Sequence, residues 1–387
     1  MQKHMFQQFF SRMSSAPFQV RYWDGKVDRY GEETPCFEIH FREKLPFPEI
    51  MSNPSLAFGE AYMDGKLELT GDMDEVLRLL SRNRASFVPK LLAPLTKMAS
   101  KKVQKENIQY HYDLGNEFYS LWLDSTMSYS CAYFKNEDDS LEQAQLQKID
   151  HVLKKLQLKP GEKLLDIGSG WGWLIVRAAQ QYGVQSMGIT LSEEQFKKTK
   201  ERIQELGLEG SVEVKLMDYR DLPHTGLRFN KIASVGMFEH VGQAQFPLFM
   251  RSVESVLNDK GLMLLHTITS PREEATNPWI TKYIFPGGYI PSLREIVNLL
   301  PDYDFHVSDI ESLRLHYAKT LDHWSERFEK HVEKVQEMYG EKFVRMWRLY
   351  LRSCASSFRV SGLNIHQILF SKGLNNDMAL TREHVYR

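Results

Sequence analysis

The chain has 387 residues, of which 42% are hydrophobic and 26% charged, and a formal net charge of −1 at pH 7. This length suggests two or three folding units, and the composition excludes a disordered or fibrous chain. The near-zero charge argues against a nucleic-acid binder, which needs a large basic field. A mean hydropathy of −0.42 and the lack of a run of about 18 apolar residues argue against a membrane-spanning helix.

The cysteines and the first residues indicate the compartment. Cys36, Cys131 and Cys354 are widely spaced with no Cys-x-x-Cys, which fits a reducing compartment and excludes a disulfide scaffold or a cysteine-based zinc site. The opening MQKHMFQQFFSRM lacks the apolar core and cleavage site of a signal peptide. We therefore expect a cytoplasmic protein.

Residues 1–88 have the pattern of a small α+β domain. The segments VRYWDGKVDRYG and CFEIHF predict strands around turns. The later segment NPSLAFGEAYMDGKLELTGDMDEVLRLL predicts a helix, a turn and a second helix, with Gly65 and Gly71 as breaks.

Residues 89–105 form a lysine-rich bridge, PKLLAPLTKMASKKVQK, in which Leu91, Leu95 and Met98 share a helical face. A solvated linker helix is the commoner meaning of such a charge run. A basic amphipathic segment lying on an anionic membrane surface is the alternative, because each lysine near such a surface adds about 1 kcal/mol of attraction. Both interpretations remain open from the sequence.

Residues 106–387 contain a region of alternating strands and helices that begins near 140. KLLDIG, VQSMGIT, VEVKLM, KIASVGM and LMLLHTI predict buried strands, and amphipathic helices separate most of them. FHVSDIESLRL and IHQILFSKG predict two further strands. This alternation predicts an α/β fold with a doubly wound, mostly parallel sheet, in which ligands bind at the carboxyl ends of the strands.

The glycine-rich turn in LLDIGSGWGW follows the first of these strands. It places Asp166, Gly168, Gly170 and Gly172 between a strand and a helix. The spacing lacks the third glycine of the dinucleotide fingerprint, and no Gly-Lys-Ser/Thr follows, so neither NAD nor a P-loop nucleotide is favoured. A glycine-rich turn alone is weak evidence, because many α/β proteins use one for packing.

The form D-x-G-x-G-x-G resembles the motif of class I S-adenosylmethionine-dependent methyltransferases, which have a Rossmann-like fold. Six ordered segments make the resemblance more specific: HYDLGNEFYSLWLD, YSCAYF, LLDIGSGWG, GITLSEEQ, GMFEHVG and YIFPGG. On these segments the chain from about 105 onward is similar to the cyclopropane-fatty-acyl-phospholipid and mycolic acid cyclopropane synthase family. Residues 1–88 resemble the additional N-terminal domain of the phospholipid enzymes, a domain that is linked to membrane engagement and dimer architecture.

The resemblance implies that a methylene is transferred from S-adenosylmethionine to the cis double bond of an unsaturated phospholipid acyl chain. Because an alkene is a poor nucleophile, the reaction needs a sulfonium leaving group, a dry pocket and a base beside the transferred methyl. The family's base is a bound bicarbonate. The positions matching its bicarbonate-binding residues are Cys131, Glu239, His266, Tyr317 and the backbone of Ile268.

The resemblance also implies the contacts with S-adenosylmethionine. The glycine turn approaches it through the backbone, Tyr129 and Ser130 contact the methionine end, and Thr190 and Gln195 take the ribose region. Tyr219 and Arg220 bracket the adenine, and Tyr112 lines the methyl-donor side. The full expected set is Tyr112, Tyr129, Ser130, Asp166, Gly168, Ser169, Gly170, Thr190, Leu191, Gln195, Tyr219, Arg220 and Gly236.

Three alternatives remain beside cyclopropanation. A related lipid methyltransferase would leave a methyl- or methylene-branched acyl chain without ring closure. A small-molecule methyltransferase would need no lipid domain, and a non-catalytic lipid-binding protein would not bind S-adenosylmethionine. We expect no metal site, because the histidines lack ligand spacing. The expected partners are an unsaturated phospholipid, an anionic membrane surface on the inner leaflet and a second copy of the chain.

Overall fold

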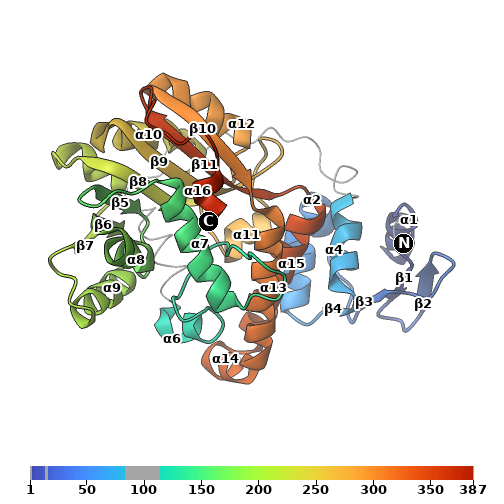
Figure 1. Ribbon diagram of the computed structural model, residues 1–387. Helices are drawn as coiled ribbons and strands as arrows, with labels where there is room; N and C mark the ends of the chain where they lie inside the picture. Colours follow the sequence, from blue (N-terminus) through green and yellow to red (C-terminus); the bar gives the residue numbers. More distant parts are fainter. Residues whose placement is uncertain (1, 14–15, 83–113, 387) are drawn as a thin grey trace. The chain divides into compact units, whose positions relative to one another are not determined.

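The computed structural model describes residues 2–13, 16–82 and 114–386, which form two compact units (Figure 1). One unit contains the described residues up to 82 together with 276–284 and 321–363. The other contains the described residues 114–275, 285–320 and 364–386. The bridge predicted over 89–105 and the predicted cofactor contact Tyr112 lie outside the described residues.

The larger unit is built on a seven-stranded sheet with the order β10-β11-β9-β8-β5-β6-β7. The strands from β9 to β7 in this order run parallel, and β11 and β10 add to β9 as antiparallel neighbours. The predicted doubly wound, mostly parallel sheet is confirmed. The strands are β5 (Lys163–Ile167), β6 (Gln185–Thr190), β7 (Val212–Leu216), β8 (Phe229–Val235), β9 (Leu257–Thr269), β10 (Phe305–Ser312) and β11 (Asn364–Lys372).

Apolar residues on both faces explain why this sheet is buried. Successive residues of a strand point to opposite faces, and here Leu164 and Leu264 belong to one core cluster whereas Leu165 and Leu265 belong to another. The first cluster includes apolar residues of α7 and α8, and the second includes residues of α10 and α12. These helices are α7 (Leu141–Lys155), α8 (Trp173–Tyr182), α10 (Phe246–Val256) and α12 (Leu293–Leu299), and α9 (Glu193–Glu205) joins β6 to β7.

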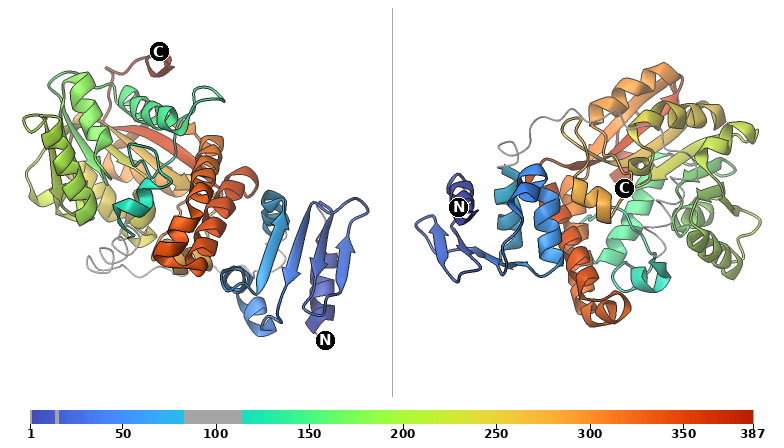
Figure 2. Two further views of the ribbon diagram at one scale, coloured as in Figure 1. Left: turned by 90° about the horizontal axis from the view of Figure 1, so that it is seen from below. Right: turned by 180° about the vertical axis from the view of Figure 1, so that it is seen from behind.

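The smaller unit contains a four-stranded sheet with the order β2-β1-β3-β4, seen in the left view of Figure 2. The predicted turn between the two helices is wrong in part, because Leu67–Gly71 forms β4 and pairs antiparallel with β3. The alternation of Leu67 and Leu69 with Glu68 and Thr70 is the signal for this strand. The elements are α1 (Gln2–Ser11), β1 (Phe18–Arg21), β2 (Val27–Tyr30), β3 (Phe37–Phe41), α2 (Phe47–Ser52), α3 (Pro54–Met63), β4 and α4 (Met73–Arg82).

The N-terminal helix α1 packs onto this small sheet. Phe6 and Phe10 are each 1% exposed, and the Phe6 ring lies 4.8 Å from that of Phe41. The opening segment MQKHMFQQFFSRM is also a candidate lipid contact by its resemblance, but its side chains Phe6 and Phe10 are used in the unit's own core. No helix within the described ranges has the length and apolar character needed to cross a bilayer.

Later helices of the chain complete the smaller unit. Arg345 on α15 hydrogen-bonds to the backbone oxygens of Tyr62 and Leu67, and Trp279 on α11 packs against Gly59, where a Cβ would lie 2.3 Å from the indole ring. The N-terminal sheet thus shares a unit with segments that lie far downstream of the boundary predicted at 88. These segments are α11 (Pro278–Tyr283), the end of α13 (Arg314–Lys330), α14 (Val332–Tyr339) and α15 (Glu341–Val360).

Candidate active site

The glycine turn between β5 and α8 forms one wall of a cavity in the larger unit. Gly168, Gly170 and Gly172 all have positive φ, and a Cβ at Gly168 would lie 2.6 Å from Met237 Cγ. Only glycine fits this turn, because other residues rarely adopt such a φ and a side chain would collide with Met237. The turn therefore leaves its backbone accessible at the carboxyl end of β5.

Most of the predicted S-adenosylmethionine contacts line this cavity, whose empty space of about 1120 Å³ includes its open mouth. They come from the carboxyl ends of β5, β6 and β8, from the turn after β7, from the start of α9 and from the loop before α7. Tyr112 lies outside the described residues, and Arg220 is not among the lining residues. The predicted contacts that line the cavity are Tyr129, Ser130, Asp166, Gly168, Ser169, Gly170, Thr190, Leu191, Gln195, Tyr219 and Gly236.

Gln195 is fixed at the start of α9. Ser192 caps this helix by accepting a hydrogen bond from the Gln195 amide, and Thr190 Oγ1 donates to Gln195 Oε1 over 2.8 Å. The side-chain nitrogen of Gln195 has no partner among the described residues, so this nitrogen remains as a donor. A ribose hydroxyl is the acceptor that the resemblance implies for it.

Tyr219 lines the cavity, whereas its neighbour Arg220 does not. The Tyr219 ring packs against Phe249 with centroids 5.3 Å apart, and its buried hydroxyl has no hydrogen-bond partner in the described part of the chain. The Arg220 guanidinium instead forms a two-bond ion pair with Asp218 and a third bond to Gln245. Both side chains are buried, so this ion pair stabilises the fold next to the lining residue Tyr219. These contacts do not support a direct contact between Arg220 and the adenine.

Lys148 on α7 is a polar lining residue that the sequence interpretation missed. It is 4% exposed, and its ammonium donates a hydrogen bond of 2.8 Å to Ser130 Oγ. Burial lowers its pKa to about 8, against the opposing effect of Asp124, Cys131 and Asp166. The only signal in the sequence is that Lys148 shares a helical face with Leu141, Ala144 and Val152, and this spacing does not show what lies opposite the lysine.

Asp166 faces the same cavity from the end of β5. It is 3% exposed, its Oδ1 has no hydrogen-bond partner among the described residues, and burial raises its pKa to about 7 despite the nearby charge of Lys148. Lys148 and Asp166 thus present a cationic donor and a carboxylate acceptor. This pair matches the carboxylate and ammonium that a free amino-acid group carries.

Glu239 and Ile268 are brought together by the fold. Glu239 lies in a 3-10 turn (Phe238–His240) after β8, and its Oε1 accepts a hydrogen bond of 2.6 Å from the Ile268 amide near the end of β9. Its Oε2 is shielded from solvent and has no partner within the described residues. Burial raises the pKa of this carboxyl, and the Ile268 bond opposes that rise. The amide that the resemblance implies for bicarbonate therefore orients the carboxylate in this structure.

His266 lies two residues earlier on β9 and is fully buried. Its Nδ1 pairs with Gln367 Nε2 over 3.1 Å, which assigns the ring proton to Nε2 because the amide nitrogen is a donor. Burial holds the pKa well below its usual value, so the ring is a neutral donor. His266 Nε2 has no partner among the described residues.

Cys131 and Tyr317 are also buried in this unit. Cys131 Sγ lies 3.2 Å from the oxygen of Ala132 and 3.9 Å from that of Leu313, and burial raises the pKa of its thiol. Tyr317 lies in the first turn of α13 with 9% exposure. Lys148 acts electrostatically on both Cys131 and His266. The convergence of all five predicted base-site residues on one ligand remains a prediction, and the described residues contain no cluster suited to a metal ion.

Comparisons with known proteins identify the family of the chain. Residues 99–368 match the family described as mycolic acid cyclopropane synthetase, and residues 5–91 match a domain of unknown function. A probable fatty acid methyltransferase of Pseudomonas putida is 41% identical over 383 residues, 96% of each chain. The cyclopropane-fatty-acyl-phospholipid synthase of Escherichia coli K12 is 40% identical over 349 residues, 87% of this chain and 88% of that protein.

A solved structure gives the same relationship in three dimensions. The crystal structure of a mycolic acid cyclopropane synthase complexed with SAH and CTAB superposes with a TM-score of 0.65 at 35% identity. The match covers 69% of this chain and 98% of that one.

Proposed function

Since the chain belongs to the mycolic acid cyclopropane synthetase family and is an S-adenosylmethionine-dependent methyltransferase acting on lipids, we propose that it is a cyclopropane-fatty-acyl-phospholipid synthase. In this proposal it transfers a methylene from S-adenosylmethionine to the cis double bond of an unsaturated phospholipid acyl chain. The substrate and the ring are the parts of the proposal that go beyond the family.

One observation carries the proposal. Glu239 Oε2 and His266 Nε2 are buried polar atoms without partners in the described structure, and they lie on the turn after β8 and on the neighbouring strand β9. Leaving such an atom unpaired costs about 1–3 kcal/mol, so each of the two is a candidate contact for a polar ligand. We propose that this carboxylate acceptor and this neutral imidazole donor share one small hydrogen-bonding group such as bicarbonate.

The reaction defines what these residues must do. Breaking the bond between sulfur and the methyl releases a neutral thioether, and one alkene carbon bonds to the methyl while its neighbour becomes cationic. Loss of a proton from the transferred methyl then closes the ring. The site must therefore keep water away from the cation and hold a base beside the methyl.

A bound bicarbonate would supply that base. Glu239 would accept a hydrogen bond from the bicarbonate hydroxyl and so increase the basicity of the bicarbonate. The His266 ring would donate a hydrogen bond to another bicarbonate oxygen. Cys131, from the segment before α7, and Tyr317, from α13, would add further donors. In the structure the Ile268 amide already donates to Glu239, so we assign it the task of orienting that carboxylate.

The second candidate function is a lipid methyltransferase that leaves a branched chain. The relative at 41% identity is named a probable fatty acid methyltransferase, which is the observation that favours it. Both reactions share the first methyl transfer. They separate afterwards, because a methylene branch retains a carbon–carbon double bond and a cyclopropane does not.

The proposal is tested with vesicles of a mono-unsaturated phosphatidylglycerol, S-adenosylmethionine and bicarbonate. Mass spectrometry of the acyl chains should show the gain of one CH₂, and the product should resist ozonolysis because the alkene is gone. A product of the same mass that ozone cleaves would favour the branched chain. No change in the acyl chains would reject both functions.

The remaining partners belong to the same proposal. An acyl chain of about 16 carbons holds roughly 10 kcal/mol of transfer energy in a bilayer, so the enzyme gains by working at the membrane surface. We propose peripheral binding at the inner leaflet and a homodimer, on the strength of the resemblance of residues 1–88. Sedimentation with and without anionic vesicles tests both points.

A further inference from the structure

The buried carboxylate of Glu239 is held by chain segments that meet at the start of α12. Its backbone oxygen accepts a hydrogen bond of 2.9 Å from the amide of Tyr289, and its Oε1 accepts from Ile268. The loop that carries Tyr289 also accepts a bond at Pro291 from the amide of Ser270, just after β9. The position of Glu239 thus depends on where the loop 285–291 lies.

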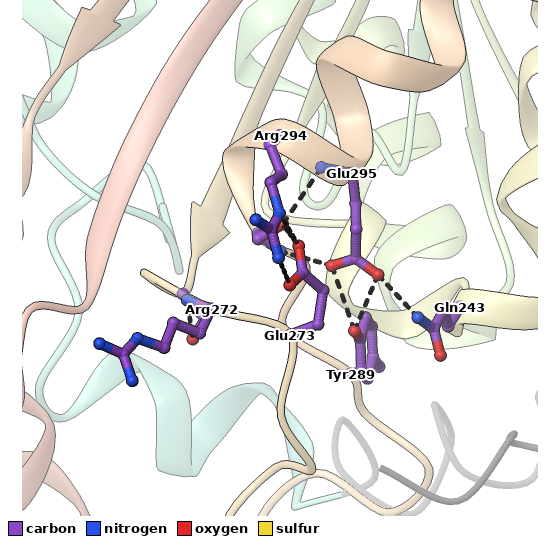
Figure 3. A network of polar contacts seen from close by, with 8 residues as sticks. Gln243, Arg272, Glu273, Tyr289, Arg294 and Glu295 are labelled. Carbon is purple, nitrogen blue, oxygen red and sulfur yellow. Dashed lines mark hydrogen bonds and ion pairs between the residues drawn. The ribbon is translucent and has the colours of Figure 1, made fainter. Parts of the chain in front are cut away.

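Glu295 lies at the centre of this region, as Figure 3 shows. Gln243, which follows Glu239 by four residues, donates to Glu295 Oε1 over 2.7 Å. The Tyr289 hydroxyl donates to both carboxylate oxygens, at 3.0 and 3.2 Å, and the Ser292 amide donates to Oε2 over 2.7 Å. One carboxylate therefore ties together the segment after Glu239, the loop that binds the Glu239 backbone and the first turn of α12.

A capping role explains only part of this arrangement. Ser292 and Glu295 form a capping box. The Ser292 hydroxyl accepts a hydrogen bond from the Glu295 amide, and the Glu295 carboxylate accepts one from the Ser292 amide. Such a box needs no partner outside the helix. The bonds from Gln243 and Tyr289 are additional, and both come from segments that hold Glu239.

We propose that Glu295 is a positioning residue for Glu239. This inference rests on the proposed function only in taking the Glu239 carboxylate as part of the base site. Glu295 is not among the residues that line the cavity; it fixes the two backbone segments on which Glu239 depends. A displacement of about 1 Å in such a group can reduce the rate by roughly 100-fold, so loss of the tie is measurable.

Glu273 provides a matched control on the same helix terminus. It accepts from the Ser292 hydroxyl over 2.6 Å and pairs with Arg294, whose side chain is 81% exposed. No bond to Tyr289 or Gln243 is found for Glu273 in the described structure, and Figure 3 shows Arg272 directed away from the cluster. Glu273→Ala therefore removes a carboxylate at the same helix terminus and leaves the hydrogen bonds of Glu295 to Tyr289 and Gln243 in place.

The test uses the full chain, with release of S-adenosylhomocysteine measured on mono-unsaturated phosphatidylglycerol vesicles. We expect Glu295→Ala to lower kcat by about 10- to 100-fold while KM for S-adenosylmethionine changes less than about twofold. The bicarbonate concentration for half-maximal rate should rise, which a merely structural role would not cause. Glu295→Gln should recover most of the rate, because an amide oxygen still accepts from Ser292 and Gln243 can turn its own amide to match.

Several outcomes overturn the inference. They are wild-type kcat in folded Glu295→Ala, an unchanged bicarbonate response, or an equal loss in Glu273→Ala. If Glu295→Ala does not fold, Tyr289→Phe removes only the hydroxyl donor, and wild-type kcat in that variant also overturns it. Failure of the proposed function is distinguished in wild-type protein, by a branched product or by a rate independent of bicarbonate.

Discussion

The ammonium of Lys148 lies 2.8 Å from the hydroxyl of Ser130, and both side chains line the cavity beside the glycine turn. An ammonium has three N–H donors, and this is the one hydrogen bond that Lys148 makes with the described residues. A buried cation with spare donors is costly unless an anion joins it. The carboxylate of S-adenosylmethionine is the anion that suits this position.

We therefore predict that Lys148→Met weakens the binding of S-adenosylmethionine by about 10-fold or more, because a charge-assisted hydrogen bond contributes about 1.5–3 kcal/mol. Methionine keeps the length of the side chain and removes its charge. Calorimetric titration measures the change in Kd, and a thermal unfolding curve shows that the variant is folded. An unchanged Kd would mean that Lys148 serves the fold alone.

The Asp166 carboxyl predicts a pH dependence of binding. Burial raises its pKa to about 7, well above the usual value of an aspartate. Its proton therefore stabilises the unliganded fold fully below the unfolded pKa, and this contribution is lost as the pH rises through about 7. A ligand ammonium favours the ionised form of Asp166, so the affinity for S-adenosylmethionine should rise as the pH rises through about 7. Below this pH, binding should release the proton of Asp166.

Calorimetry in buffers of different ionisation enthalpy measures that proton release. Asp166→Asn is the matched variant, because it retains the shape of the side chain and cannot ionise. We expect it to bind more weakly and with no proton release attributable to this site. Equal proton release in Asp166→Asn and wild type would assign the proton to another group.

Glu239→Gln tests the base site directly. We expect the binding of S-adenosylmethionine to stay within about threefold of wild type, since Glu239 is not among the residues that line the cavity. Turnover should fall by about 100- to 10,000-fold, the usual contribution of a group engaged in proton transfer. Stopped-flow or steady-state release of S-adenosylhomocysteine measures it, and wild-type turnover would remove Glu239 from its assigned role.

Arg220→Met tests whether Arg220 stabilises the fold or binds S-adenosylmethionine. Its ion pair with Asp218 is buried, with 7% and 8% of the two side chains exposed. Removing one partner of such a pair typically costs about 3–5 kcal/mol. We expect a clear loss in the free energy of unfolding by urea, with little change in the affinity of the remaining folded protein for S-adenosylmethionine. A stable variant with weakened binding would restore Arg220 as an adenine contact.

Local patterns were sufficient to predict much of the larger unit. The alternation of apolar strands with amphipathic helices identified β5 to β9, because each of these segments buries its own side chains in a period that the chain itself displays. The glycine turn followed from the same logic, since positive φ and close approach to Met237 leave glycine alone at Gly168. Most residues expected around S-adenosylmethionine line the cavity because they lie at strand ends of a parallel sheet.

Other features depend on which segments meet in space. The strand at Leu67–Gly71 was missed because a short half-exposed strand forms only when β3 supplies its partner. The sequence shows the charges of Lys148 and Arg220 but not their roles. Those roles depend on their partners, which are Ser130 for Lys148 and Asp218 with Gln245 for Arg220. The bond from Ile268 to Glu239, and the meeting of Gln243, Tyr289 and Ser292 at Glu295, join residues from separate elements. Local conformation and the available chemical groups depend on neighbours along the chain, so they can be predicted from the amino-acid sequence. The pairing of donors with acceptors depends on the folded chain, because burial removes water and brings distant groups into contact.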